Sequence, residues 1–353
     1  MKPIYIVSWL FALAVSFVSC DDWLDKTPKD RLYPDVYFKT EDELRLFTNQ
    51  FYNNLVPSAV DIYSESSDLI VKSDLMLEMS GQRIIPDEGN GWNFTALRDI
   101  NFYLQYSHNC TEVNARNRYD GVARFFRAYF YFEKVKRYGD IPWYDKALDS
   151  DDPELYKARD SREFVMQKML EDLDFAIANL PKTKNAYVLT RWTALALKSR
   201  VCLFEGTFRK YHGLEDCEKY LNACVSASET FMNESGYTLY KSGSTPYRDL
   251  FASINLQADE VIFGRDYEAS LSVLHNVQNY ENSTTMGRPG MNKKIVNSYL
   301  MADGSRFTDK AGYETMTFDQ ECQNRDPRLA QTIRTPGYTR IGSTKKEAPN
   351  LAY

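Results

Sequence analysis

The sequence contains few residues of the kinds that hold metals or build disulfide frameworks. It has only three histidines among 353 residues, and no two of them share a helical or metal-ligand spacing. Its six cysteines include no pair spaced as Cys-x-x-Cys. Cys202, Cys217 and Cys224 fall on apolar helix faces, where a thiol acts as a small buried hydrophobic group. We therefore expect no metal site, no cofactor and no disulfide framework, although an exported chain could form one pair.

Basic clusters and phosphate-binding loops are also missing. The formal net charge is −6, and no run of Lys and Arg is long enough for a nucleic-acid-binding stripe. Because contact with phosphates needs a basic face, nucleic acid is excluded as a partner. Residues 287–290 read GRPG, but they lack the Lys-Ser/Thr pair of a phosphate loop. Aromatic residues, in contrast, make up 14% of the chain, and they build both cores and flat stacking surfaces.

The first twenty residues have the pattern of an export signal. Lys2 gives a positive start, and residues 4–18 form an apolar run broken only by two serines. This 15-residue run would reach roughly 22 Å as a helix, short of the ~30 Å hydrocarbon core. A signal peptide over residues 1–19 is thus favoured over a membrane anchor. Its Ser-Cys end resembles a bacterial lipobox, in which Cys20 would carry the lipid; an ordinary signal peptide is the alternative.

Hydrophobic residues recur at helical spacing after a polar tether over residues 20–39. Thr40 with Glu43 forms a capping-box pattern, which predicts a helix start. A helix over 190–205 is apolar on both faces, so we expect it in the middle of a domain. Further helices are expected from Thr95, over Phe125–Val135, from caps at Asp160 and Glu163 to Leu180, and over 215–231.

The four helices between residues 120 and 232 fall into two hairpins. Phe-Glu recurs at residues 132–133 and 204–205, 72 residues apart, which is about two tetratricopeptide periods of about 34 residues. We predict a mainly α fold of tetratricopeptide-like helix hairpins with loop-rich insertions and a little β; a plain helical bundle is the alternative.

After residue 236 we expect loops, a short strand within 259–267 and one short helix. Residues 334–353 are expected to be turn-like, with no closing strand.

Some loops place aromatic rings beside polar side chains. A sugar ring stacks its C–H face on a flat aromatic, and its hydroxyl groups need Asn, Asp, Gln or Arg nearby. Loops on a rigid scaffold are where binding residues gather. The candidate ligand-binding residues are Trp92 with Arg83 and Asn93, Tyr280 with Asn282, and Tyr63. Packing of these rings onto the core is the alternative, and it is the one we favour for Tyr280 and Tyr63. We also expect Trp143, which follows Pro142 at a helix end, and Trp192 to pack in the core.

Two acidic positions invite a catalytic interpretation. Asp303 precedes a glycine and Asp326 precedes a proline, so both are expected in turns rather than as catalytic acids. No catalytic residue is predicted from the sequence.

Several segments, taken in order, resemble the SusD/RagB family of outer-membrane nutrient-binding lipoproteins of Bacteroidetes. They are CDDWLDKTPKD (20–30), ARFFRAYFYFEKVKRYGDIP (123–142), RWTALALKSRVCLFEGT (191–207), MADGSRF (301–307) and NRDPRL (324–329). Members of this family continue well past the Arg-Asp-Pro-Arg segment. The resemblance therefore implies that the chain lacks the family's C-terminal part.

The resemblance implies a non-catalytic, surface-exposed lipoprotein of a starch-utilisation type of system. It would capture glycans, or oligopeptides, and deliver them to a SusC-like TonB-dependent transporter. A lipid such as palmitate on Cys20 would hold it to the outer membrane, facing the exterior. The SusD-like helical domain would span residues 40–353, with repeat-like helix pairs over about 120–232 and a loop-rich binding region over about 236–353. A surface-anchored glycan hydrolase and a protein-binding tetratricopeptide adaptor lipoprotein remain the other classes.

Overall fold

The computed structural model of the chain describes residues 36–57, 69–71, 77–86, 89, 91–275, 290–342 and 345–347. The predicted signal peptide and most of the predicted tether lie outside these residues. The same is true of Cys20, Tyr63, Tyr280 and Asn282, so their roles stay predictions. Within the described part the fold is mainly helical with a little β structure, as the sequence predicted.

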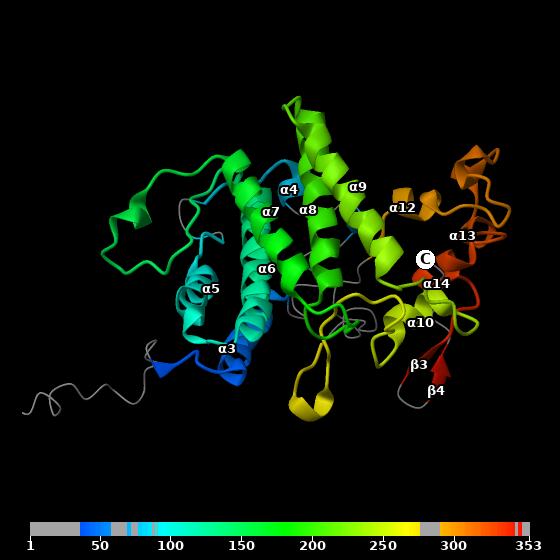
Figure 1. Cartoon of the computed structure of the whole chain (residues 1–353). Coiled ribbons are helices and arrows are strands. Elements are labelled where there is room, and N and C mark those ends of the chain that lie inside the picture. The colour runs from blue at the N-terminus through cyan, green and yellow to red at the C-terminus, as the bar shows by residue number, and fades with distance from the viewer. Residues whose placement is uncertain are drawn as a thin grey trace, which may run out of the picture.

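Long helices build the described chain up to residue 235. They are α3 (Glu41–Leu55), α5 (Thr95–Tyr106), α6 (Val113–Tyr138), α7 (Arg162–Asn179), α8 (Arg191–His212) and α9 (Cys217–Glu234), with the short α4 (Leu77–Ser80), η3 (Ser107–Asn109) and η4 (Pro153–Tyr156) between them. Helix α6 packs on α7, α7 on α8 and α8 on α9, while α3 and α5 cover α6 (Figure 1). Neighbours in the chain are thus neighbours in space, as helix hairpins require.

Short elements follow, and α10, α12, α13 and α14 among them lie on the far side of α9 (Figure 1). The helices are α10 (Pro246–Ala252), η5 (Ala269–Leu271), α12 (Lys293–Ser298), η6 (Phe307–Asp309), η7 (Tyr313–Thr315), α13 (Phe318–Glu321) and α14 (Pro327–Thr332). The strands form two antiparallel pairs, β1 (Ile70–Val71) with β2 (Gly290–Met291) and β3 (Arg340–Gly342) with β4 (Lys345–Glu347). The first pair joins a segment that precedes α5 to the late part of the chain.

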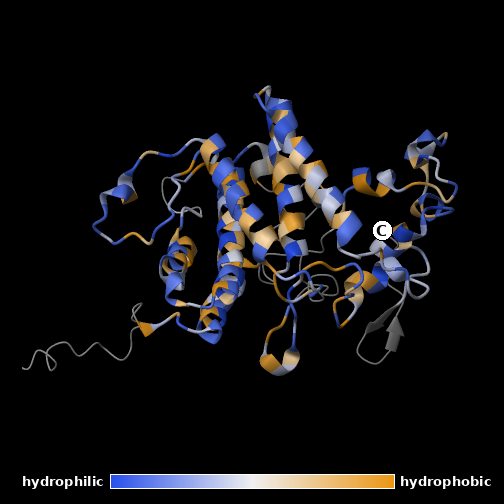
Figure 2. Ribbon diagram, viewed as in Figure 1, coloured by the Kyte–Doolittle hydropathy of each residue, from blue (hydrophilic) through white to orange (hydrophobic). Residues whose placement is uncertain are grey.

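Aromatic side chains of α6 form the centre of the core. Phe126 and Tyr131 are at most 1% exposed, and Val201 of α8 is fully buried. Each such side chain contributes about 1.5–3 kcal/mol by leaving water. Trp143 and Trp192 are only 5% and 4% exposed, which confirms their assignment to the core. Apolar and polar stripes alternate around the helices, with polar residues on their outer faces (Figure 2).

Helix α8 is longer than predicted. The sequence interpretation ended it at residue 205, whereas the helix continues to His212 and ends at Gly213 in the left-handed conformation. Gly206 does not break the helix but allows α9 to approach. A Cβ at Gly206 would lie 2.7 Å from the side chain of Leu221, which is too close for any L-residue.

The predicted helix caps are partly confirmed. Thr40 and Glu43 form the capping box at the start of α3. The prediction for α7 is wrong by one residue, because the Ser161 side chain accepts the cap hydrogen bond from the Phe164 backbone. The Asp160 carboxylate accepts a hydrogen bond from the backbone N–H of Trp143 at 2.7 Å instead.

Three predictions for the late part of the chain are wrong. The stretch 259–267 forms no strand; it is irregular, with the N–H of Gly264 donating to the carbonyl of Ala186 at 2.9 Å. Helix α10 lies in a stretch expected to be loop, and the β3–β4 hairpin lies in one expected to be turn-like. Such short elements depend on contacts distant in sequence: the N–H of Arg248 at the start of α10 donates to Gln331 Oε1 of α14 at 3.1 Å.

The two late segments of the family resemblance lie side by side. The N–H of Ala302 donates to the carbonyl of Asn324 at 2.8 Å, and the N–H of Asp326 donates to that of Leu300 at 2.9 Å. The Arg325 guanidinium, which is buried, joins them further. It donates to the backbone carbonyls of Val296 and Tyr299 at 2.8 Å each and of Glu321 at 2.9 Å.

The acidic residues in these segments stabilise turns. Asp303 accepts hydrogen bonds from the N–H and hydroxyl of Ser305 at 2.9 and 2.6 Å. Asp326 accepts one from the N–H of Arg328 at 2.9 Å, at the start of α14. The interpretation of Asp303 as a turn residue is confirmed, whereas Asp326 is the N-cap of α14.

The described cysteines are all free thiols, and burial raises the pKa of Cys202 to about 12. That thiol is therefore protonated at physiological pH.

In the described part of the chain, no helix has both the length and the apolar character needed to cross a membrane. Within the same residues, His, Cys, Asp and Glu side chains do not gather into a group of three that could hold a metal ion.

Candidate functional site

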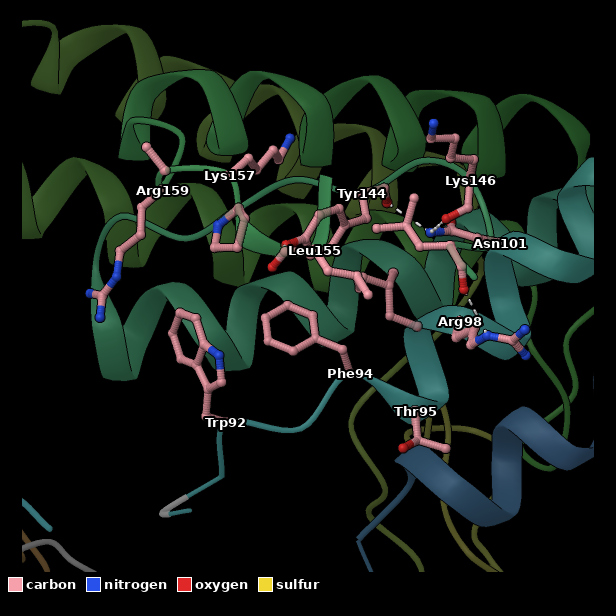
Figure 3. Close-up of a pocket in the computed structure, with 14 residues that line it drawn as sticks. Trp92, Phe94, Thr95, Arg98, Asn101, Tyr144, Lys146, Leu155, Lys157 and Arg159 are labelled. Carbon is pink, nitrogen blue, oxygen red and sulfur yellow. Dashed lines mark hydrogen bonds between the residues drawn. The ribbon is translucent and has the colours of Figure 1, made fainter. Parts of the chain in front are cut away.

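A hollow of about 520 Å³, which we call the aromatic pocket, lies between the start of α5 and the loop that joins α6 to α7 (Figure 3). One wall consists of Trp92, Phe94, Thr95, Leu97, Arg98 and Asn101, and the other of Pro142, Tyr144, Lys146, Leu148, Leu155, Lys157, Ala158 and Arg159. Three aromatic rings and four cationic side chains thus share one pocket, and none of its lining residues is Asp or Glu.

The backbone that carries Trp92 has a fixed conformation. Gly91 has φ +87°, and a Cβ there would lie 3.4 Å from the Tyr138 hydroxyl, so this position favours glycine. The Lys134 ammonium donates a hydrogen bond to the carbonyl of Gly91. The Asn93 side chain accepts one from the N–H of Thr95 at 2.8 Å, where α5 begins.

Trp92 lies at the rim of the pocket and is 40% exposed. Its ring meets Phe94 and Tyr138 edge-on, at centroid distances of 5.3 and 4.9 Å. The Arg159 guanidinium lies over the ring, 4.9 Å from its centroid. Figure 3 shows Trp92, Phe94 and Arg159 facing the same space. The indole is therefore held by aromatic neighbours while part of it stays open to solvent.

A buried polar network anchors the opposite wall. Asn101 is fully buried; its amide donates to the carbonyl of Tyr144 at 2.8 Å and accepts from Arg127 at 3.2 Å. Arg127 in turn forms two hydrogen bonds with Asp172, at 2.6 and 2.8 Å. Burial opposes the charge of Arg127, but its hydrogen bonds with Asp172 and the charge of Asp172 outweigh that effect and raise the pKa of Arg127. The wall is thus tied to α5, α6 and α7 together.

Tyr131 of α6 provides the second anchor. Its hydroxyl accepts a hydrogen bond from the N–H of Tyr144 at 2.6 Å, and its ring stacks on Trp143 at 4.2 Å. The Tyr144 hydroxyl donates to the carbonyl of Leu155 at 3.3 Å. Burial, and next the charge of Asp160, raise the pKa of Tyr144, so its hydroxyl is neutral at physiological pH. Both walls of the aromatic pocket are therefore formed before any ligand arrives.

Most of the cationic side chains in the aromatic pocket have carboxylate partners outside its lining. A hydrogen bond to Glu154 raises the pKa of Lys146, so this ammonium is charged at neutral pH. The ion pairs are Arg98 with Asp149 at 3.8 Å, Lys146 with Glu154 at 3.0 Å, and Lys157 with Asp160 at 3.0 Å.

A second pocket, of about 590 Å³, adjoins the first, and Thr95 lines both. It is lined by Asn54, Leu55, Val56, Pro57, Asn93, Thr95, Ala96, Asp99, Tyr129, Phe130, Glu133 and Lys134. Burial raises the pKa of Asp99 and lowers the pKa of Lys134. The structure thus places Trp92 and Asn93 in neighbouring pockets rather than in one, and Arg83 is exposed and lines neither.

Sequence reasoning missed much of the aromatic pocket. The segment between α6 and α7 was not among the predicted binding loops, yet it supplies Tyr144, Lys146, Lys157 and Arg159. The available signal was the aromatic pair at residues 143–144, followed by cations at three later positions. Hydrophobic periodicity does not register such residues, because they belong to no helix stripe.

Two family models match the chain. The first, described as starch-binding and associating with the outer membrane, matches residues 79–191, which include the whole aromatic pocket. The second, described as the SusD family, matches residues 228–350.

Curated relatives come from Formosa agariphila. SusD-like protein P2 is 26% identical over 294 residues, which are 77% of this chain and 55% of the relative. SusD-like protein P38 is 24% identical over 226 residues, 58% of this chain and 43% of the relative. The chain thus spans about half the length of the curated relatives it matches.

Solved structures share the fold. A SusD-like protein from Bacteroides fragilis superposes with a TM-score of 0.67 at 22% identity, covering 87% of this chain and 62% of the other. A SusD-like carbohydrate-binding protein from the same species gives 0.65 at 16% identity, covering 83% and 59%. A structure determined with xylogluco-oligosaccharide gives 0.57 at 18% identity, covering 74% and 55%. With both family models and these relatives in agreement, the chain belongs to the SusD/RagB family.

Proposed function

We propose that the protein captures glycans at the cell surface in the aromatic pocket and passes them on without chemistry of its own. The observation that carries this proposal is the partly exposed indole of Trp92 at the rim of a pocket with anchored walls. A flat aromatic ring offers a stacking surface for the C–H face of a sugar. The solved relatives named as carbohydrate-binding, or determined with an oligosaccharide, support the same class of ligand.

The size and lining of the aromatic pocket suit an oligosaccharide segment. Its volume of about 520 Å³ falls within the range of about 300–1,000 Å³ that is typical of ligand pockets. Hydroxyl groups of a sugar need donors and acceptors, which Thr95, Arg98 and Tyr144 supply around the aromatic rings. Oligopeptides are the second ligand class, because the aromatic rings would also accept their side chains.

A binding role agrees better with the lining than a hydrolytic one. Glycoside hydrolysis generally uses two carboxyl groups, about 5–5.5 Å apart in retaining enzymes and about 6.5–9.5 Å apart in inverting ones. The lining of the aromatic pocket carries no carboxylate. The neighbouring second pocket contains Asp99 and Glu133, but its lining aromatics, Tyr129 and Phe130, are mostly buried.

Delivery and anchoring form the wider part of the proposal. Cys20 carries the lipid that holds the chain to the outer membrane, and a SusC-like TonB-dependent transporter receives the glycan. Arg83, Asn93, Tyr63, Tyr280 and Asn282 remain proposed as further ligand contacts outside the aromatic pocket. The family model described as associating with the outer membrane supports this location.

Titration calorimetry with a panel of oligosaccharides tests the binding step. Trp92→Ala should lower affinity at least about thirtyfold, because truncating a central aromatic anchor costs ~2 kcal/mol or more. Tyr211→Ala is the matched control, since Tyr211 is 80% exposed near the end of α8, outside both pocket linings, and should leave affinity unchanged. A reducing-end assay on the same mixtures should show no cleavage.

Two results would contradict the proposal. Release of new reducing ends by the purified protein would identify a hydrolase. Recovery of a large barrel protein with the chain, combined with no affinity for any glycan or peptide, would identify a protein-binding adaptor.

A further inference from the structure

We propose that the aromatic pocket selects glycans that carry an acidic group, a carboxylate or a sulfate ester, and that Arg159 is the residue that binds it. This inference rests on the proposed function and adds the class of glycan. The chain as a whole has a formal net charge of −6, yet the pocket is lined by four cations and no carboxylate. The charged side chains that line the pocket are therefore all positive, although the chain as a whole is acidic.

The four cations are not equivalent. Arg98, Lys146 and Lys157 each have a carboxylate of the protein within 4 Å. Arg98 and Lys157 also donate to the backbone carbonyls of Leu148 and Trp143, at 3.1 and 2.6 Å. These three side chains hold the loop in place, and each already shares its charge with a protein group before a ligand arrives.

Arg159 differs from them. It is exposed, and among the described residues its guanidinium makes no ion pair or hydrogen bond; its contact is the face of Trp92 at 4.9 Å. The adjacent carboxylate of Asp160 is already occupied by Lys157 and by the N–H of Trp143. A planar guanidinium with five unused donors suits a carboxylate or sulfate, which it binds through two parallel hydrogen bonds.

The position of Arg159 beside Trp92 favours acidic sugars over neutral ones. Because the guanidinium lies over the indole, a sugar ring that packs on Trp92 brings its substituents next to Arg159. A ligand that uses both groups needs an apolar ring face and an anionic group on the same residue. Uronic acids and sulfated sugars have both, whereas a neutral sugar uses only the ring face.

The test compares acidic oligosaccharides with forms of the same backbone that lack the charge. The probes are an oligogalacturonate with its methyl ester, and a sulfated galactan oligosaccharide with its desulfated form. Titration calorimetry on the full chain should give at least about tenfold tighter binding for the charged member of one pair or both. The two pairs distinguish a carboxylate from a sulfate ester. Raising the salt concentration should reduce this preference, because salt screens exposed charges.

Variants assign the preference to one side chain. Arg159→Gln should bring the ratio of the two affinities to about one. Arg200→Gln is the matched control, because Arg200 is an exposed arginine of α8 outside both pocket linings, and it should keep the wild-type ratio. Equal affinity of the wild type for both members of each pair would overturn the inference and leave the proposed function intact. Absence of binding to every glycan would overturn both.

Discussion

The helices before residue 236 pack around a large apolar core and a smaller cluster at Trp192, whereas the described segments after it bury few side chains. In the first region, rings such as Phe126, Tyr103 and Tyr131 are at most 1% exposed, and Phe126 and Tyr103 both meet Phe51 of α3. In the second, the buried side chains are Phe307, Leu329, Glu321 and Arg325. The second region gains order mainly from hydrogen bonds that Arg325 and short capping side chains make to the backbone.

This difference has a consequence for where function lies. The aromatic pocket sits on the first region, where α5, α6 and α7 fix both of its walls through buried contacts. A binding surface that is formed in advance loses less conformational entropy when a ligand arrives. The late region, which the sequence suggested as the loop-rich binding part, supplies no residue to the aromatic pocket among those described.

The largest expected effect comes from breaking the buried ion pair of the first region. Asp172→Ala leaves the Arg127 guanidinium buried and unpaired, and the free energy of unfolding should fall by about 3–5 kcal/mol in urea titrations. Asp174→Ala is the control, because Asp174 pairs with Lys198 at an exposed position and should cost less than about 1 kcal/mol. Equal losses of unfolding free energy in the two variants would contradict the claim that burial makes the Arg127–Asp172 pair more costly to break.

A smaller, local effect is expected in the second region. Arg325→Ala removes hydrogen bonds to four backbone carbonyls, and their loss should destabilise the second region locally. Amide hydrogen exchange should accelerate over residues 293–329 while the amides of α6 keep their protection. Arg328→Ala, whose guanidinium is exposed and contacts Asp326, should leave exchange near the wild-type rate. Loss of protection throughout α6 would show instead that the two regions unfold together.

An added methyl group should destabilise the contact between α8 and α9 more than the contact between α6 and α7. Gly206→Ala places a methyl group 2.7 Å from Leu221, and such overpacking costs about 1–3 kcal/mol, partly offset by the better helix propensity of alanine. Gly121→Ala of α6 meets Leu180 at 3.4 Å, an ordinary contact, and should be neutral or slightly stabilising. Thermal unfolding of the two variants gives the comparison, and a more stable Gly206→Ala would contradict it.

Alkaline pH should lower the stability of the first region, whereas pH changes near neutrality should leave it unchanged. Burial raises the pKa of Tyr52 to about 12, and its hydroxyl accepts a hydrogen bond from the N–H of Leu189 at 3.0 Å. A group whose folded pKa exceeds its unfolded value of about 10 stabilises the fold fully below pH 10, and this contribution is lost as pH rises toward 12. Urea midpoints should therefore decline over that window, less steeply in Tyr52→Phe. If the urea midpoints of the wild type and Tyr52→Phe decline equally, other tyrosines cause the effect.

The sequence predicted the first region well because its helices carry apolar residues at helical spacing. The start of α3 at Thr40, the start of α5 at Thr95 and the burial of Trp192 all follow from such local signals. The end of α8, in contrast, was predicted too early. The helix continues through Gly206, whose missing side chain makes room for Leu221 of α9.

The candidate site was predicted less completely. Trp92 was identified from its glycine-rich loop, but Tyr144 and Arg159 come from a segment that has no periodic pattern. They reach the aromatic pocket because Asn101, Tyr131 and the Arg127–Asp172 pair hold the loop from three helices, a contact set that local sequence does not encode. For the second region, the role of Arg325 could not be inferred, since its partners are backbone carbonyls rather than particular side chains.

The most direct measurement is a tryptophan fluorescence titration of the full chain with oligosaccharides. Trp143 and Trp192 are buried, whereas Trp92 is 40% exposed at the aromatic pocket, so a bound sugar should change the emission of Trp92 first. We expect a saturable change in the wild type that disappears in Trp92→Phe. An equal change in both proteins, or no change where calorimetry detects binding, would place the glycan elsewhere and contradict the account.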